Sequence, residues 1–342
     1  VSDMANGKGD EVIEHTVEFF KVLIYLVLLV SLLNSAARIR RFVAWIGVFS
    51  AVTALLATVQ YHGAIEIAEA NASMPETPKA EETTVNKKPK QRGAFVQEKY
   101  KDPETGKMVP VQRICGTGLF SDPNDLGLVL ITGVPIALYW MARRETGGKR
   151  WLWLLPLAVF FYTLILTSSR GSMLALMAGL GVLFLLRHGR RRSVMVGLAV
   201  FPVLLIVFAG RMTDFTSSEG TGSGRIQLWS EGLWMFREAP LWGVGMNEFA
   251  MRARLVAHNS FIHCYAELGL PGGTLFLGAF VLALLAMIRL SRDPERIADP
   301  ELRKLHPFLM AFFVAFLVGI LFLSRAYVVP TYTVLGLIVA YL

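Results

Sequence analysis

Long apolar blocks alternate with short, polar, mostly basic stretches along most of the 342-residue chain. A helix needs about 20 apolar residues to cross a bilayer, and roughly nine blocks approach that length. They lie at approximately 18–33, 42–61, 125–142, 151–168, 171–186, 193–209, 271–288, 307–323 and 326–342. Strands of a membrane barrel alternate apolar and polar residues, and these blocks do not. The pattern therefore predicts an all-α, polytopic transmembrane helix bundle.

The apolar blocks and the two long polar loops divide the chain into five regions. The first loop is rich in Pro, Lys, Glu and Thr over 71–110, which indicates a partly flexible segment. The second loop combines Gly, Trp and Arg with a helical pattern, and no internal repeat is evident. The regions are N-terminal helices 1–61, extracytoplasmic loop 62–124, helices 125–209, helical extracytoplasmic loop 210–270 and C-terminal helices 271–342. The chain starts at Val1 and ends within an apolar run at Leu342, so we expect a fragment of a longer membrane protein.

Charge supports this reading and orients the bundle. Only 18% of residues are charged, against about 25% in a typical soluble domain. A net charge of +8 would suggest nucleic acid in a soluble protein, but here Lys and Arg concentrate in short loops, as at cytoplasmic ends of membrane spans. These basic loops are 34–41, 142–150, 187–192 and 289–306. One orientation puts all four in the cytoplasm and both long loops outside, and no nucleic-acid partner is expected.

The predicted spans carry almost no ionisable residues. Apart from Lys21 near the edge of the first span, none holds a charge near its middle, whereas pumps and ion-coupled transporters usually need such residues. The sequence shows no Cys/His metal cluster and no outer Asp-x-Asp pair. Cys115 and Cys264 are too few for a disulfide framework, although they could pair with each other. We therefore expect any chemistry at the outer ends of the spans, with no cofactor and no metal.

Two arginines on the predicted outer side have no topological explanation. Arg170 lies between two spans with almost no loop, and Arg225 follows a Gly-rich stretch in the first turn of a predicted helix. Each could simply anchor the protein to lipid headgroups. Alternatively, each guanidinium could bind a phosphate group bidentately, and the helix N-terminus before Arg225 would favour the same anion.

A histidine and a glutamate flank a short predicted helix in the same outer region. Asn259 or Ser260 can cap this helix, and Gly269 with Pro271 can end it. His258 could be structural, but an imidazole titrates near pH 6.5 and can accept a proton from a hydroxyl. Glu267 could orient backbone or arginine groups. The Asp122 segment before the third span is better explained as a turn and helix cap.

Five segments, taken in order, resemble the O-antigen ligase and polymerase superfamily. They cover 116–124, 169–172, Arg225 with Trp229, 240–245, and 258–261 with 267–272. The resemblance implies a GT-C-like multi-helix glycosyltransferase at the outer face of the bacterial inner membrane. It would take a glycan from undecaprenyl diphosphate and need neither metal nor cofactor. The family's phosphate-binding arginines fall on Arg170 and Arg225 and its catalytic histidine on His258, with Asn259 and Glu267 as further substrate-binding candidates.

The acceptor stays open at this point. Ligases of this superfamily use the lipid A-core, polymerases extend another lipid-linked chain, and relatives glycosylate proteins. The chemistry of the residues agrees with an inverting transfer, because arginines can stabilise the leaving diphosphate and a histidine can deprotonate the acceptor hydroxyl. A transporter or flippase that only binds lipid-linked glycan is the alternative from another class. It would need matched polar sites on both faces, and the inner loops show only basic clusters.

Overall fold

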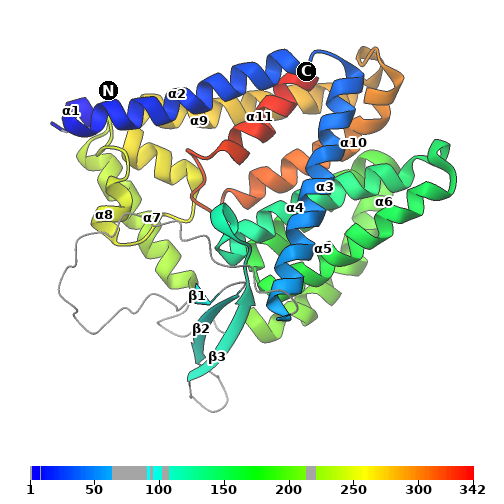
Figure 1. Ribbon diagram of the computed structural model, residues 1–342, viewed down its shortest axis with the longest axis horizontal. Coiled ribbons are helices and arrows are strands. Elements are labelled where there is room, and N and C mark those ends of the chain that lie inside the picture. Colours follow the sequence, from blue (N-terminus) through cyan, green and yellow to red (C-terminus); the bar gives the residue numbers. More distant parts are fainter. Residues whose placement is uncertain (1, 8, 64–90, 93–94, 102–107, 213–220) are drawn as a thin grey trace. The chain divides into compact units, whose positions relative to one another are not determined.

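The computed structural model describes residues 2–7, 9–63, 91–92, 95–101, 108–212 and 221–342 (Figure 1). It is 82% helical. Among the described residues, seven helices are long and apolar enough to cross a membrane. They are Val12–Leu32, Ala36–Tyr61, Pro123–Ala142, Arg144–Thr167, Arg170–Ala199, Ser260–Arg292 and Pro300–Gly319, with a shorter apolar helix at Val329–Tyr341. The predicted all-α polytopic membrane bundle is confirmed.

The helices follow the predicted apolar blocks with several differences in bounds, and the helices Ser260–Arg292 and Pro300–Gly319 begin earlier than the blocks 271–288 and 307–323 that they contain or overlap. The predicted spans 171–186 and 193–209 both lie in α6, which is broken at Gly189 (φ 79°, ψ 166°) inside the predicted basic loop. The first helix begins well before residue 18. The α-helices are α1 (Ser2–Ala5), α2 (Gly9–Leu32), α3 (Ala36–Tyr61), α4 (Pro123–Ala142), α5 (Leu154–Thr167), α6 (Arg170–Met212), α7 (Thr221–Glu238), α8 (Glu248–Ala253), α9 (Ser260–Arg292), α10 (Pro300–Gly319) and α11 (Val329–Tyr341).

A small antiparallel sheet occupies part of the first long loop, where the sequence analysis predicted no strands. Its strands are β1 (Gln91–Arg92), β2 (Phe95–Lys101) and β3 (Met108–Ile114), in the order β1-β2-β3. Phe95 pairs with Ile114 at the end of the hairpin. The charged and amide residues of these strands hide the alternation that would mark a strand, and the rest of the segment predicted as flexible lies outside the described residues.

The chain forms two compact units, which are described separately. Unit 2 comprises Trp45–Leu176, and in it α4 packs against α5. A Cβ atom on Gly133 would lie 2.7 Å from Cζ of Phe160, so the absence of a side chain permits the close approach of the two helices. Asp122 caps α4 by accepting a hydrogen bond from the backbone N–H of Asn124, which confirms the predicted turn and cap.

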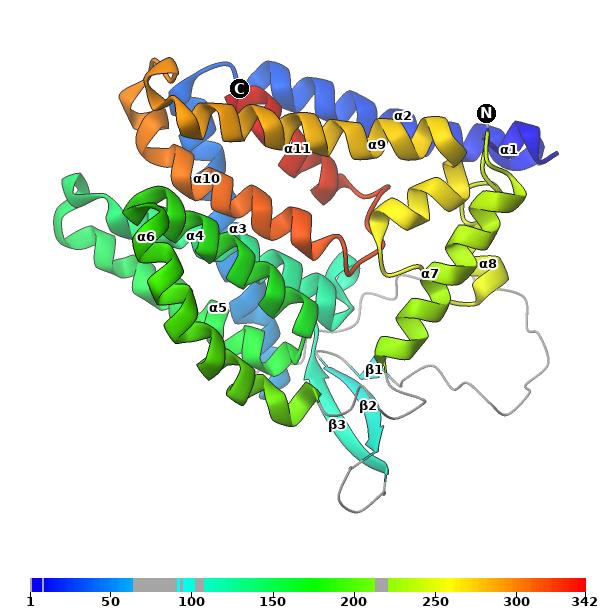
Figure 2. The same ribbon diagram turned by 180° about the vertical axis from the view of Figure 1, so that it is seen from behind.

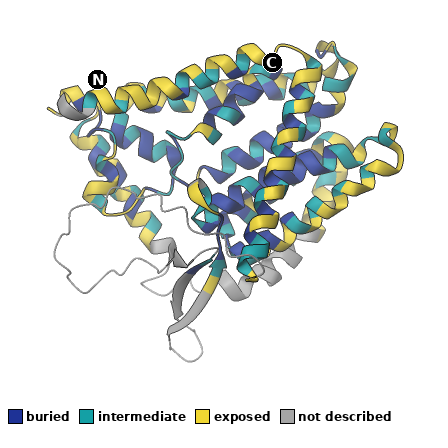
Figure 3. Ribbon diagram, in the orientation of Figure 1, coloured by how far each residue is buried: buried dark blue, intermediate teal, exposed yellow. Residues whose placement is uncertain are grey.

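Unit 1 comprises Val1–Ala44 and Met177–Leu342, and in it α11 packs along α2 (Figures 1 and 2). The Tyr25 hydroxyl lies 2.7 Å from Oγ1 of Thr333, and Gly336 admits the side chains of Leu26 and Leu29. The outer surface of α2 exposes large apolar side chains along its length (Figure 3). Such a surface suits contact with lipid tails, in agreement with a membrane-spanning helix.

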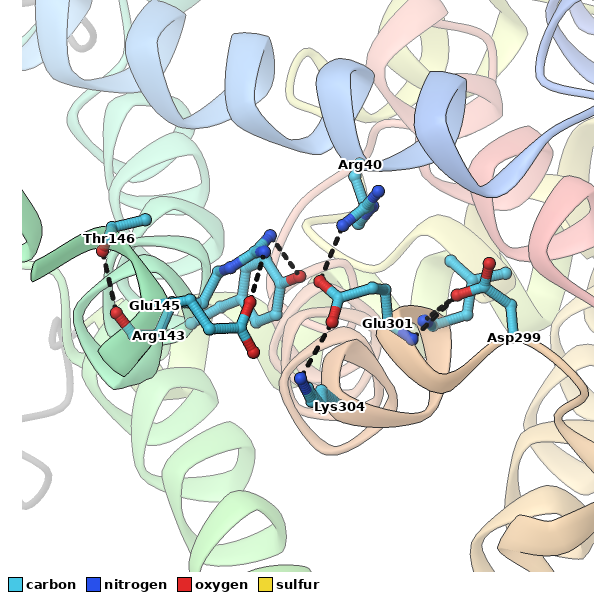
Figure 4. A network of polar contacts seen from close by, with 9 residues as sticks. Arg40, Arg143, Glu145, Thr146, Asp299, Glu301 and Lys304 are labelled. Carbon is cyan, nitrogen blue, oxygen red and sulfur yellow. Dashed lines mark hydrogen bonds and ion pairs between the residues drawn. The ribbon is translucent and has the colours of Figure 1, made fainter.

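The basic loops of unit 1 that were predicted to be cytoplasmic lie together. Arg40 forms a 2.7 Å ion pair with Glu301, which also pairs with Lys304 at 2.9 Å (Figure 4). The Arg187 guanidinium lies 5.2 Å from the ring of Phe308, near the start of α10. The loops 34–41, 187–192 and 289–306 therefore gather at one end of the unit. In unit 2, the Arg143–Glu145 pair stabilises the fourth basic loop at 3.1 Å (Figure 4).

Candidate functional site

The predicted helix cap at Asn259 is confirmed in unit 1. Asn259 is extended (φ −157°, ψ 114°) and its Oδ1 accepts hydrogen bonds from the backbone N–H groups of Phe261 and Ile262, at 3.0 and 3.1 Å. An asparagine here satisfies donors that the first turn of α9 would otherwise leave unpaired. Its carboxamide oxygen is thus used by the helix, so contact with a substrate would fall to its NH₂ group.

His258 precedes this cap in an unusual backbone conformation. Its φ of 48° lies in the left-handed region, which few residues other than glycine adopt. Both neighbours are fixed, since Asn259 caps α9 and the carbonyl oxygen of Ala257 accepts a hydrogen bond from Nε1 of Trp229 at 3.0 Å. The surrounding structure therefore holds a strained residue in place. Such strain is common at functional sites and favours the hypothesis that His258 is functional.

The Trp229 contact also connects Arg225 to this region. Arg225 and Trp229 are one turn apart on α7, and both are half-buried. Because α7 begins at Thr221, Arg225 follows the first turn rather than lying within it as the sequence analysis predicted. The structure brings the helix that carries Arg225 against the residue next to His258, so the two predicted site residues belong to one folded region.

Two glycine-containing segments meet at the other end of the short helix. α9 is broken at Gly269 (φ 67°, ψ −163°), as the sequence predicted from Gly269 and Pro271. The break leaves backbone carbonyl groups of α9 without helical partners, and these carbonyls accept hydrogen bonds from N–H groups of the loop 240–247. Val244 N–H donates to Ala266 at 3.0 Å, and Gly245 N–H donates to Glu267 at 3.2 Å. Leu270 N–H in turn donates to the Pro240 carbonyl at 2.8 Å. The segments 240–245 and 267–272 are therefore halves of one backbone junction.

Because the backbones are packed closely at this junction, we expect that adding one methyl group at Gly243 destabilises the fold. Gly243 has φ of 73°, and a Cβ atom there would lie 2.3 Å from the carbonyl of Glu267. The left-handed conformation alone costs roughly 1–2 kcal/mol for a residue other than glycine, and the clash adds to it. We expect Gly243→Ala to lower the melting temperature of the purified protein clearly, while Gly197→Ala, which meets nothing within 4 Å, does not. Equal melting temperatures for the two variants would contradict this packing.

Glu267, near the end of the second long loop, is fully buried. Its Oε1 accepts the backbone N–H of Phe249 at 3.1 Å, and its Oε2 lies 3.0 Å from Nε2 of His263. These contacts hold α8 against the first part of α9, beside a small core formed by Leu228, Met235, Val244, Phe249, Ala257 and Ala266. The predicted role of Glu267 in substrate binding stays a prediction. The observed contacts favour a positioning role for this carboxylate.

The N-terminal segment also reaches this junction, which the sequence analysis did not anticipate. The Asp3 carboxylate accepts the backbone N–H of Met246 at 2.8 Å, and Asn6 Nδ2 donates to the Gly243 carbonyl at 2.8 Å. Ser2 Oγ donates to the Glu267 carbonyl at 2.6 Å. No local signal identifies these bonds, because they join residues more than two hundred positions apart.

Arg170 lies in unit 2 as the first residue of α6, two residues after the left-handed Ser168. Ser169 Oγ donates to Oδ1 of Asn124 at 2.8 Å, so the segments 116–124 and 169–172 are directly hydrogen-bonded. Arg113, which was not among the predicted site residues, contacts Asn124 of the first segment and Thr167, which lies just before the second. Its Nε donates to the Thr167 carbonyl at 2.8 Å, and Nη2 lies 3.3 Å from the same Asn124 oxygen. A common site of Arg170 with His258 and Arg225 stays a prediction, since they belong to separately described units.

Metal-ligating side chains do not cluster in the part of the chain that the structure describes: no group of three or more His, Cys, Asp or Glu could hold an ion there. Cys115 and Cys264 are both buried thiols, and neither forms the disulfide that the sequence left open.

The helices, their apolar surfaces and the basic loops define a multi-pass membrane protein. Residues 155–277 match the family model described as O-Antigen ligase. The chain is also 25% identical over 244 residues to "Exopolysaccharide production protein ExoQ" of Rhizobium meliloti (strain 1021), covering 62% of this chain and 53% of that protein. It thus spans about half the length of this curated relative. These matches confirm the predicted resemblance to the O-antigen ligase superfamily.

Proposed function

We propose that this protein is a membrane glycosyltransferase of surface polysaccharide biosynthesis, O-antigen ligase-like in its reaction. It would transfer a glycan from undecaprenyl diphosphate to an acceptor hydroxyl at the periplasmic face of the bacterial inner membrane. The observation that carries the proposal is His258, held in a left-handed conformation where α7 and α9 meet. It lies within the matched family segment together with Arg170 and Arg225.

The proposed reaction is a direct displacement at the anomeric carbon. The acceptor oxygen forms the new glycosidic bond, and the sugar–phosphate bond breaks with both electrons passing to the diphosphate. His258 accepts the acceptor's proton, which a positioned base accelerates by about 10²–10⁴-fold. Arg170 and Arg225 bind the diphosphate and stabilise the charge that grows on it, in place of a metal ion. In-line attack inverts the anomeric centre.

A second candidate is a polymerase that adds the glycan to another lipid-linked chain. The observation that favours it is the likeness to a protein named for exopolysaccharide production, which extends well beyond the family segment. Both reactions use the same donor chemistry, so the same residues would serve either acceptor. A flippase or transporter of lipid-linked glycan would use the arginines for binding and would leave His258 without a chemical role.

Deleting the gene and analysing surface and lipid-linked glycan separates these candidates. We expect surface polysaccharide to be lost while full-length lipid-linked polymer accumulates outside the inner membrane. Single lipid-linked repeat units there would instead identify the polymerase, and accumulation on the cytoplasmic side would identify a transporter. Complementation with the parent gene should restore the glycan, whereas His258→Ala should not. Unchanged surface and lipid-linked glycan would contradict the proposed function.

A further inference from the structure

Arg325, an arginine that the proposed function does not use, lies between α10 and α11. It follows Ser324 as Arg170 follows Ser169, and each pair lies between two of the predicted spans. Arg40, at the basic end of unit 1, pairs with Glu301 near the start of α10, whereas Arg325 follows the opposite end of that helix. The bias of basic residues toward cytoplasmic loops therefore does not explain Arg325.

The backbone around Arg325 is bound to the start of α9, next to His258. Ser260 makes all three contacts: its N–H donates to the Ile320 carbonyl at 3.0 Å, and its Oγ donates to the Leu323 carbonyl at 2.7 Å. The same Oγ accepts the N–H of Arg325 at 2.9 Å. Thr331 Oγ1 donates to the Arg325 carbonyl from the other side. Arg325 is thereby fixed within unit 1 beside a residue two positions from the proposed base.

The next aromatic residue in this connection reaches the same short helix. The ring of Tyr327 lies 5.6 Å from that of His263, edge to face at 87°. His263 lies one turn after Asn259 and pairs with the buried Glu267. The connection between α10 and α11 thus packs against the start of α9. Arg325 supplies a positive charge in this connection.

We infer that Arg325 is a further substrate-binding residue of the His258 site, where its guanidinium holds an oxyanion of the substrate, a phosphate or a carboxylate. This inference rests on the proposed function and adds to it a residue, Arg325, that binds the substrate. A half-buried cation at the end of a membrane segment is costly unless it faces anions. A guanidinium offers five N–H donors in a planar fork, so it can keep a protein contact and still bind an oxyanion with two bonds.

The oxyanion could belong to the donor diphosphate or to an acidic group of the acceptor, and steady-state kinetics distinguishes them. Arg325→Gln and Arg325→Lys leave the backbone bonds to Ser260 and Thr331 available, so folding should survive in both. We expect Arg325→Gln to raise KM for one substrate by about 10–100-fold, the usual weight of a hydrogen bond to a charged group. A raised donor KM assigns the diphosphate, and a raised acceptor KM assigns the acceptor. Arg325→Lys should recover only part of the loss.

Arg237→Gln is the matched control, since Arg237 is an exposed arginine on α7 and its replacement should leave both KM values unchanged. Parent values of both KM and kcat in Arg325→Gln would overturn the inference. If the parent shows no transfer at all, the proposed function fails, and ligand-induced thermal stabilisation still tests Arg325. The probes are then farnesyl diphosphate and lipid A-core extracted from the deletion strain. Stabilisation by either that Arg325→Gln weakens supports the oxyanion site. Stabilisation that is equal in parent and variant, or absent with both probes, overturns it.

Discussion

Replacing Arg170 or Arg225 with lysine lowers glycan transfer by about 10²–10³-fold if these residues stabilise the leaving diphosphate, the usual cost of losing one such donor. Lysine keeps the positive charge but loses the planar fork that matches two phosphate oxygens. The rate should fall together with donor affinity, because the charge on the leaving group is larger in the transition state than in the bound donor. The measurement is transfer from a purified polyprenyl diphosphate donor, with equal amounts of folded protein.

The control for these variants is Arg237→Lys, which should keep parent activity. If Arg170 and Arg225 only anchor the protein to lipid headgroups, lysine serves equally well and both variants stay active. Added magnesium or manganese should not restore either variant. Recovery of activity with a divalent ion would show that the arginines share their role with a metal.

Replacing His258 with alanine should reduce kcat by about 10²–10⁴-fold while donor binding survives, since the diphosphate is held by other groups. Alanine alone does not isolate the imidazole, because His258 is left-handed (φ 48°) and alanine adopts that conformation poorly. His258→Asn is the sharper variant. Asparagine tolerates the left-handed region and can hydrogen-bond, but it cannot act as a base.

Both His258 variants should therefore lose turnover and keep donor affinity, and His258→Asn should also keep the parent melting temperature. A His258→Asn protein that turns over at near the parent rate would return His258 to a purely structural role before the cap of α9. Loss of donor binding in both variants would instead place His258 among the diphosphate ligands.

Much of the fold follows from local signals that the sequence displays directly. Apolar length predicts the spans, and the cap at Asn259 and the break at Gly269 each depend on one or two neighbouring residues. The basic loops 34–41 and 289–306 of unit 1 meet through the ion pair of Arg40 with Glu301, and their cytoplasmic side stays a prediction. In the sequence, Gly243 and Gly269 are recognisable only as parts of two separate motifs. The structure shows that the absence of a side chain at each one leaves room for the backbone of the other segment.

The remainder depends on contacts between distant parts of the chain. The hydrogen bond from Ser260 to Leu323 joins residues sixty-three positions apart, and no periodicity or spacing indicates it. Arg325 could have been found from the argument applied to Arg170, since each arginine follows a serine between two predicted spans. The burial of Glu267 could not have been predicted from the sequence, because it depends on how α8 packs against α9. The strands β2 and β3 were missed because polar residues interrupt their apolar pattern.

Glycan transfer by the purified full-length protein, with a chelator present, tests the central claim most directly. The reaction contains a polyprenyl diphosphate-linked glycan, an acceptor and EDTA, and the product is separated by gel and by mass. We predict transfer at the same rate with and without the chelator, release of free polyprenyl diphosphate in equal amount to product, and loss of both with Arg225→Lys. Transfer abolished by the chelator and restored by a divalent ion, or donor bound without any release of diphosphate, would contradict a metal-free glycosyltransferase built on arginine and histidine.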